Sequence, residues 1–360
     1  LALPPQAVTS PEEHLGRPVG ADFTLADWDE VAGYYRLVAE QSPHVELEVV
    51  GETTEGREFL LATIGSVENL ARLAELKAVA RRIADPRGLS DAEAALLLDE
   101  SVPFLFVSLG MHSTECAAPQ FGMELLHLLA TSDREPYRSA RERVVVFMPA
   151  CLNPDGLDRV TRWYREHVGT PYEATGLTEL YQRYAGHDNN RDWFGMALEE
   201  TRVVTRLLYG ELFPHVYWDV HQQGSTEERF FVPPYRDPLN GNLDAGVITA
   251  IDLLGTRALH DMQREGLTGI STGVSYDMWW NGGNRNVPVR KNIAGLLTEA
   301  ASANLGSPAW LPIGRLSAPG GVEGGYRPSN RFPSPWPGGW WRVRDVVEYE
   351  HAFARSLLGS

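Results

Sequence analysis

Histidine and glutamate side chains follow two apolar segments of the chain at spacings that suit a metal ion. His112 and Glu115 stand three residues apart, directly after the apolar run 102–109, and His221 follows a second apolar run, 216–220. Two histidines and one glutamate leave a position open for water, as in catalytic zinc sites, whereas structural zinc has four protein ligands. The alternative for His112 and Glu115 is a surface histidine beside a helix whose first turn carries a glutamate.

A hydrolytic metal site also needs a base that takes a proton from water. Glu299 follows the short strand-like run 295–298 and is the candidate base; its alternative is a glutamate at the start of a helix. Asn190 and Arg191 lie side by side in the polar stretch 186–194. A guanidinium beside an amide can hold a carboxylate through paired hydrogen bonds. The alternative here is a polar loop held by Asp–Arg pairs.

The elements that must position these residues alternate between strand and helix. Continuous apolar runs such as 102–109, bounded by Pro103 and Gly110, are typical of buried strands in a parallel sheet. The sequence predicts strands at 45–50, 59–64, 102–109, 144–148, 216–220 and 295–298, and helices at 22–41 (with Thr24 as N-cap), within 67–99, and at 115–131, 197–211, 245–264 and 343–358. This alternation predicts an α/β fold with helices on both faces of the sheet and a site beyond the carboxyl ends of its strands.

We expect one catalytic domain over residues 22–317. Residues 1–21 form a Pro-rich lead-in that we expect to be extended, and residues 318–360 comprise a Gly-, Pro- and Trp-rich loop followed by a helix. The start without Met suits a mature chain whose export signal was removed, or a trimmed chain. The last helix has no clear capping sequence, so we expect the natural chain to continue past residue 360.

The composition makes several classes of function improbable. Forty-eight acidic against 32 basic side chains give a net charge of −16, which repels nucleic acid phosphates and anionic lipid headgroups. The longest apolar runs are about half of the roughly 20 residues that cross a bilayer, so no membrane span is expected. Cys116 and Cys151 are too few for a disulfide framework, although one bridge or thiol pair between them stays open. The oligomeric state is not predicted.

Taken together, the motifs resemble those of the zinc metallocarboxypeptidases of the carboxypeptidase A-like family. They are His112-x-x-Glu115, Asn153-Pro-Asp-Gly156, Asp188-x-Asn190-Arg191, His221 after an apolar strand, and Glu299. Their order and spacing match the family over about residues 23–310. The chain is most similar to a bacterial branch that carries the extended form GHDNNRDWF, found here at 186–194. The resemblance implies a single α/β domain with a central twisted sheet that is mixed but mostly parallel.

The resemblance also implies the roles of the matched residues. The zinc ligands would be His112, Glu115 and His221, which would bind one Zn²⁺ ion per chain. Glu299 would be the general base that passes a proton of water to the leaving amine. Asn190 and Arg191 would hold the free α-carboxylate of a peptide substrate, so that its C-terminal residue is released.

Two further roles implied by the resemblance have competing candidates. An arginine after the Asn-Pro-Asp-Gly motif stabilises the oxyanion in this family; Arg165 is the favoured match and Arg162 the alternative. A substrate-capping tyrosine matches Tyr276, whose alternative is a core aromatic residue. The stretch from Tyr276 to Lys291 departs from the digestive enzymes of the family, so the preferred substrate side chain is left open.

Three hypotheses follow. The first is a zinc-dependent carboxypeptidase, secreted or periplasmic in a bacterium. The second is an amidase with the same site, acting on cell-wall (murein) peptides or N-acyl amino acids; the pair Asn190 and Arg191 favours a substrate with a free carboxylate. The third is a zinc- or peptide-binding module without turnover, against which the presence of Glu299 argues.

Overall fold

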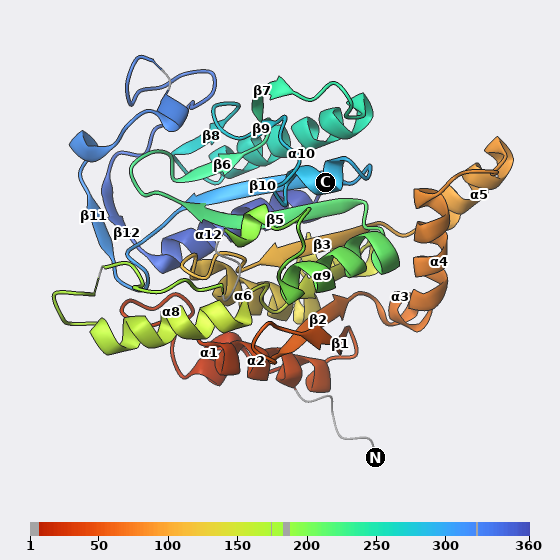
Figure 1. The fold of residues 1–360 in the computed structure, drawn as a ribbon, viewed down its shortest axis with the longest axis horizontal. Coiled ribbons are helices and arrows are strands. Elements are labelled where there is room, and N and C mark those ends of the chain that lie inside the picture. Colours follow the sequence, from red (N-terminus) through yellow and green to blue (C-terminus); the bar gives the residue numbers. More distant parts are fainter. Residues whose placement is uncertain (1–6, 174, 183–187, 322) are drawn as a thin grey trace.

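A mixed sheet forms the centre of the protein in the computed structural model, which describes residues 7–173, 175–182, 188–321 and 323–360 (Figure 1). In this part of the chain the sheet has eight strands in the order β1-β2-β4-β3-β5-β10-β6-β8. Their bounds are β1 (Val45–Glu52), β2 (Glu58–Ile64), β3 (Phe104–Leu109), β4 (Val145–Pro149), β5 (Val216–Gln223), β6 (Phe230–Val232), β8 (Ile270–Thr272) and β10 (Ala294–Ala301). The inner strands β4, β3, β5 and β10 are mutually parallel, while β1–β2, β2–β4 and β10–β6 pair antiparallel. The predicted α/β fold with a mixed, mostly parallel sheet is confirmed.

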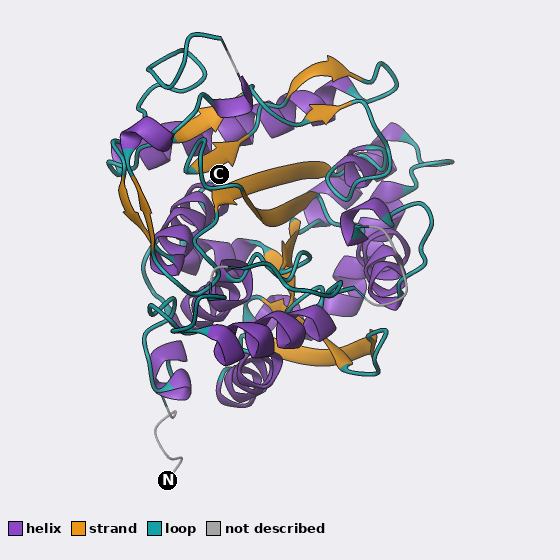
Figure 2. Ribbon diagram, turned by 60° about the vertical axis from the view of Figure 1, so that its left-hand side comes forward, coloured by secondary structure: helices purple, strands orange, loops and turns teal. Residues whose placement is uncertain are grey.

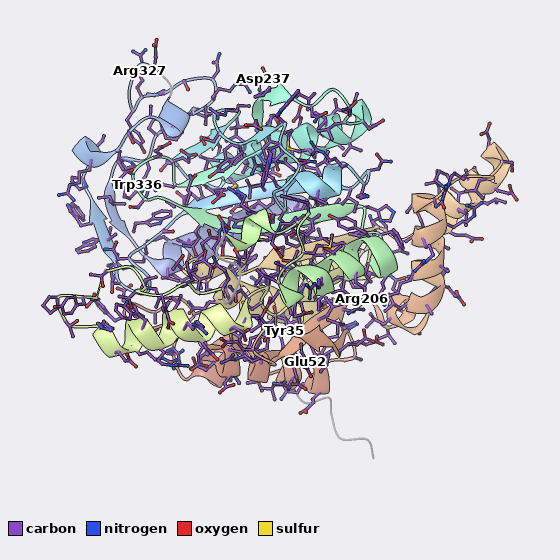
Figure 3. All side chains as sticks on the ribbon, in the orientation of Figure 1. Tyr35, Glu52, Arg206, Asp237, Arg327 and Trp336 are labelled. Carbon is purple, nitrogen blue, oxygen red and sulfur yellow. The ribbon has the colours of Figure 1, made fainter. Side chains whose placement is uncertain are left out.

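Helices cover both faces of this sheet (Figure 2), because alternate residues of a strand point to opposite sides. One face packs against α2 (Trp28–Gln41), α6 (Ala117–Thr131), α10 (Ala245–Arg264) and α12 (Val343–Leu358). The other packs against α4 (Leu73–Ala84), α9 (Glu199–Arg206) and the π-helical turn η2 (Leu207–Leu212). In β3, Leu105 and Val107 face the first group and Phe106 faces the second. Tyr35 of α2, labelled in Figure 3, is fully buried in the first layer.

Shorter elements complete the fold. They are α1 (Pro11–Leu15), α3 (Val67–Ala71), α5 (Asp91–Glu100), α7 (Tyr137–Arg143), α8 (Pro154–His167), η1 (Asn189–Arg191), α11 (Asn286–Val289), η3 (Ile313–Arg315) and η4 (Pro319–Gly321). Two small sheets pair β7 (Arg236–Leu239) with β9 (Asp277–Met278), and β11 (Ala309–Leu311) with β12 (Gly339–Trp341). Helix α5 projects away from the body (Figure 1) and buries none of its residues.

Two local expectations need correction. The helix predicted from residue 22 begins at Trp28, because Asp27 forms a reciprocal capping box with Glu30; Thr24 instead donates to the carbonyl of Ala21. Part of the lead-in expected to be extended forms α1, which has a capping box of its own. The helical structure expected within 67–99 is confirmed and consists of three separate helices.

Cys116 and Cys151 are both buried free thiols, so the structure does not contain the bridge that the sequence left open. Burial raises the pKa of each thiol to about 12, which keeps both protonated and poorly reactive near neutral pH. Within the described ranges, no helix combines the length and the apolar character needed to cross a membrane.

Candidate metal centre

Neighbouring parallel strands bring the predicted metal ligands to one edge of the sheet. His112 and Glu115 lie in the loop that joins β3 to α6, and His221 lies in the last part of β5. Because β3 and β5 pair in parallel, their carboxyl ends meet at the same edge. One ligand atom from each of the three side chains can be chosen so that all lie within 4.8 Å of one another. The structure therefore brings together residues that are more than a hundred positions apart in the chain.

Both histidines direct the same ring atom toward Glu115. The Nδ1 atom of His112 lies 2.6 Å from one carboxylate oxygen of Glu115, and the Nδ1 atom of His221 lies 2.9 Å from the other. The opposite ring atom of each histidine faces a different carboxylate: His112 Nε2 is 3.1 Å from Asp188, and His221 Nε2 is 3.2 Å from Asp219. Carboxylates placed behind metal-binding histidines fix the tautomer and orient the ring, so both Nδ1 atoms are held toward a common centre.

The charges of this cluster stabilise one another. Burial lowers the pKa of His112, but the carboxylates of Glu115 and Asp188 outweigh burial and raise that pKa to about 9. Burial raises the pKa of Glu115, but the two histidines bring it down to about 2. The pKa of His221 also rises well above its ordinary value, because Asp219 and Glu115 overcome the effect of burial. The carboxylates around the two imidazoles thus favour positive charge at this centre. Two imidazoles and one carboxylate are also a set of donors that fits zinc.

Asp219 received no role from the sequence, although it lies beside the cluster. It is completely buried, and its Oδ1 atom accepts hydrogen bonds from Ser108 Oγ (3.0 Å) and Asn284 Nδ2 (3.1 Å). Residues two apart in a strand point to the same face, so the pattern Asp219-x-His221 in a predicted strand was a signal for this partner. Asp188 is the corresponding partner of His112 and belongs to a motif that the sequence had already identified.

The candidate base is fixed by the register of the sheet. Glu299 lies inside β10, not in the first turn of a helix, and pairs across the parallel ladder with His221. Its side chain is almost completely buried. Burial raises the pKa of the Glu299 carboxyl to about 7, even though the imidazole of His221 acts in the opposite direction. A carboxyl with a pKa near 7 suits proton transfer near neutral pH.

The predicted carboxylate clamp adjoins the cluster. Asn190 is buried; its Nδ2 lies 3.4 Å from His221 Nε2, and its Oδ1 accepts from the backbone N–H of Asn284 (2.8 Å). Arg191 is exposed, with its guanidinium carbon 5.3 Å from the centre of the Trp280 ring. Residues 186 and 187 of the longer motif lie outside the described residues. Asn190 therefore contacts the cluster directly, and Arg191 lines a pocket together with Gln223 and Tyr276.

Tyr276 lies beside the candidate base. Its hydroxyl donates to Gln223 Oε1 at 2.9 Å, and its ring lies 5.0 Å from that of Phe231. Burial raises the pKa of the Tyr276 hydroxyl, and the carboxylate of Glu299 raises it further, so the hydroxyl keeps its proton. The backbone of Tyr276 has a φ of 57°, a strained value for a residue with a side chain, and such strain is often found at functional sites.

The arginines proposed for the oxyanion lie elsewhere. Arg165, in the last turn of α8, forms ion pairs with Asp27 at 2.6 Å and Glu30 at 3.0 Å. Arg162 is exposed, and no contact with the cluster is recorded for either arginine among the described residues. The helix α8 continues through both positions to His167, which carries them along the surface toward α2. The structure thus does not bring Arg165 or Arg162 to the centre.

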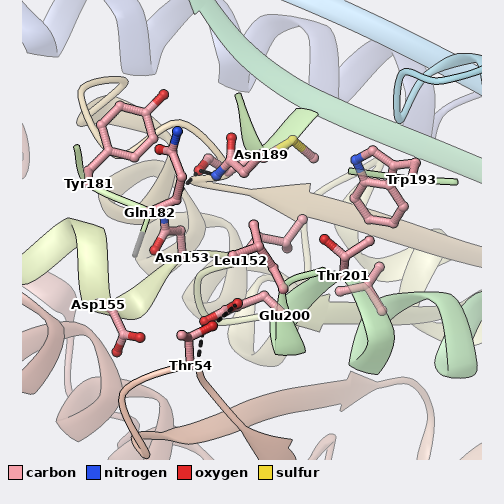
Figure 4. A pocket seen from close by; sticks show the side chains of 13 residues that line it. Thr54, Leu152, Asn153, Asp155, Tyr181, Gln182, Asn189, Trp193, Glu200 and Thr201 are labelled. Atoms are coloured by element: carbon pink, nitrogen blue, oxygen red, sulfur yellow. Dashed lines mark hydrogen bonds between the residues drawn. The ribbon is translucent and has the colours of Figure 1, made fainter. Parts of the chain in front are cut away.

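A small cavity is lined by Met111, next to His112 in the chain, and by residues of the neighbouring loops. Its lining includes Asn153, Asn189 and Glu200, and Glu200 accepts hydrogen bonds from Thr54 (Figure 4). Its volume of about 20 Å³ is enough for roughly one water molecule and too small for a substrate side chain. The cavity is therefore not a binding pocket for the substrate.

Comparison with known proteins identifies one family. The sequence model of one protein family, described as zinc carboxypeptidase, matches residues 31–276, which is more than half of the chain. A search of curated proteins finds no significant match to the chain.

Solved structures with a similar fold include three metallocarboxypeptidases. The enzyme from Burkholderia cenocepacia has a TM-score of 0.56 and 15% identity, over 93% of this chain and 70% of its own. Carboxypeptidase A from Helicoverpa armigera has a TM-score of 0.56 and 13% identity, over 94% of this chain and 73% of its own. The enzyme from Pseudomonas aeruginosa has a TM-score of 0.56 and 14% identity, over 93% of this chain and 69% of its own. At these identities the likeness is one of fold.

Proposed function

Because the chain belongs to the zinc carboxypeptidase family and is a peptide-bond hydrolase of that family, we propose that it releases the C-terminal residue of peptides. The observation that carries the proposal is the cluster of His112, Glu115 and His221, within 4.8 Å of one another, with a buried glutamate paired beside it. These three side chains would hold one zinc ion per chain. When bound, zinc would supply Lewis-acid chemistry, polarising a carbonyl and making water more acidic.

Within this proposal, the residues around the cluster position the substrate and move the proton. Arg191 binds the free α-carboxylate of the peptide, and Asn190 completes this clamp next to His221. Glu299 accepts a proton from water on its carboxylate and gives it to the leaving amine. Its pKa of about 7 supports both halves of this transfer near neutral pH. Tyr276 covers the substrate and donates a hydrogen bond through its hydroxyl. Arg165 has no part in the proposed site.

The test is hydrolysis of blocked dipeptides by zinc-loaded protein, compared between free and amidated C-termini. We expect about one zinc per chain and cleavage only of substrates with a free carboxylate. The substitution Glu299→Gln should lower kcat at least about 100-fold and leave the zinc content unchanged, because it removes the base and keeps the ligands. Glu46→Gln, at an exposed glutamate of β1, is the matched control and should change neither quantity.

Other outcomes decide against this function. Cleavage of amidated and free substrates at equal rates would contradict the carboxylate clamp. Cleavage of murein fragments or N-acyl amino acids, without cleavage of dipeptides, would support the amidase alternative. Zinc binding without hydrolysis of any of these substrates would support the binding module.

A further inference from the structure

An arginine-lined pocket opens beside the metal centre. It has a volume of about 470 Å³ and shares Tyr276 and Gln223 with the surroundings of the candidate base. Three arginines line it: Arg191, Arg236 and Arg285. The chain as a whole has a net charge of −16, so these three guanidiniums are opposite in sign to the overall charge of the protein.

The acidic residues of the pocket do not neutralise these arginines. Glu227 and Asp277 also line it, but Glu227 accepts from the backbone N–H of Gly320, and Asp277 Oδ1 accepts from the backbone N–H of Trp279. No ion pair within 4.0 Å is recorded between any of the three arginines and a carboxylate in the described part of the chain. The pocket therefore presents positive charge that the protein itself leaves unpaired.

Arg285 is the least exposed of the three arginines. It is half-buried, its Nη2 donates to the backbone carbonyl of Asp277 (3.1 Å), and its buried Nε has no hydrogen-bond partner. Its guanidinium carbon lies 5.4 Å from the centre of the Tyr276 ring, which ties it to the residue beside the base. Because this Nε is shielded from solvent, a substrate carboxylate would bind the guanidinium through its Nη atoms, where a charge-assisted hydrogen bond is stronger than one between neutral groups.

We propose that this pocket receives an acidic side chain, so that the enzyme prefers peptides whose C-terminal residue is glutamate or aspartate. The inference rests on the proposed function, because it names the substrate of the same site. Arg191 binds the α-carboxylate, while Arg285, with Arg236 at the rim, binds the side-chain carboxylate. Charge-assisted hydrogen bonds of this kind predict a preference for glutamate over glutamine of about 10- to 100-fold in kcat/KM.

The experiment compares four blocked dipeptides that differ only in a C-terminal Glu, Gln, Leu or Arg. The same peptides are titrated calorimetrically into the zinc-loaded Glu299→Gln variant, which reports binding without turnover. Arg285→Gln should remove the preference for Glu over Gln in both measurements, because the Glu peptide loses more than the Gln peptide does. Arg236→Gln, at an exposed position where folding is not at risk, should reduce the same preference. Arg264→Gln removes an equal charge from the exposed end of α10 and should have no effect.

The outcomes separate this inference from the proposed function. A wild-type preference for Leu or Arg, or an equal loss for all four peptides in Arg285→Gln, would overturn the acidic pocket and leave the peptidase intact. No hydrolysis by the wild type, together with tighter binding of the Glu peptide, would support the pocket and overturn the peptidase. Equal binding of the four peptides would overturn the pocket in either case.

Discussion

In the metal centre each charged group already faces an opposite charge of the protein, whereas in the adjoining pocket, among the described residues, the guanidiniums form no ion pair with a carboxylate. Glu115 lies between His112 and His221, and two further carboxylates stand behind these rings. Arg285, by contrast, keeps a buried nitrogen without a partner. The centre is therefore organised before any metal or substrate arrives, while the pocket depends on its ligand. Changes in the centre should abolish function, and changes in the pocket should redirect it.

The largest effect is expected for Glu115→Gln. The neutral amide cannot balance two imidazoles and is a poorer metal donor, so we expect the zinc content to fall below about a tenth of an ion per chain and hydrolysis to fall to background. Elemental analysis after dialysis, followed by the dipeptide assay, measures both. Retention of a full zinc complement would show that the centre does not use this residue.

Asp188→Asn should have a smaller effect in the same region. The amide can still contact His112 but no longer carries the charge that orients the ring and raises its basicity, so zinc affinity should fall about 10- to 100-fold. Competition with a chelator of known affinity gives the dissociation constant. An unchanged constant would place Asp188 outside the support of the centre and would weaken the contrast with the pocket.

Arg236→Gln tests the pocket at its exposed rim. Because water screens an exposed charge, the preference for glutamate over glutamine should fall only about two- to fivefold, less than in Arg285→Gln. The ratio of the two kcat/KM values measures this. An effect as large as that of Arg285→Gln would mean that the rim and the half-buried position bind the substrate equally.

Glu350 gives an effect on stability and its pH dependence, with none expected on activity. This carboxyl is completely buried in α12 and, unlike Glu115, has no hydrogen-bond partner among the described residues. Burial raises its pKa well above the ordinary value, and the charge of Glu115 adds to this. Folding must therefore keep a proton on Glu350 that the unfolded chain releases above about pH 4, so this residue lowers stability as the pH rises toward its folded pKa.

Denaturation of the metal-free protein at pH 5 and pH 8 checks this sign. Glu350→Gln should raise the free energy of unfolding more at pH 8 than at pH 5, by about 1–3 kcal/mol, because each pH unit of proton linkage is worth about 1.4 kcal/mol. Glu46→Gln is again the control, since its carboxyl is exposed in the folded protein. Equal effects at both pH values would show that Glu350 is ionised or paired in the folded state.

The sequence was most informative where function depends on local order. His112, Glu115, His221 and Glu299 each follow or end an apolar strand, and parallel strands place such positions at one edge, so their meeting could be predicted from the pattern alone. The fold class could be predicted for the same reason. Their individual roles stay predictions, as do the domain limits and a secreted or periplasmic location.

Long-range packing accounts for what the sequence did not predict. Arg165 has the spacing expected of an oxyanion group, but whether it points to the centre depends on how α8 docks on α2, where Asp27 and Glu30 bind it. The pocket escaped prediction because Arg236 and Arg285 come from separate segments: Arg236 lies in β7, which pairs with β9, and Arg285 donates to the carbonyl of Asp277 in β9. Asp27 replaced Thr24 as helix cap because of its capping box with Glu30.

The pairing of Glu299 with His221 across β10 and β5 means that the register of these two strands sets the distance between the candidate base and a metal ligand. Side chains alternate along a strand, so inserting one residue into β10 ahead of Glu299 would turn this carboxyl toward the α12 side and leave Thr298 or the inserted residue in its place. Insertions in loops that carry no residue of the centre would not change this register. The length of such loops is therefore free to vary, but not the few residues of backbone that set the distance between the base and the metal ligands.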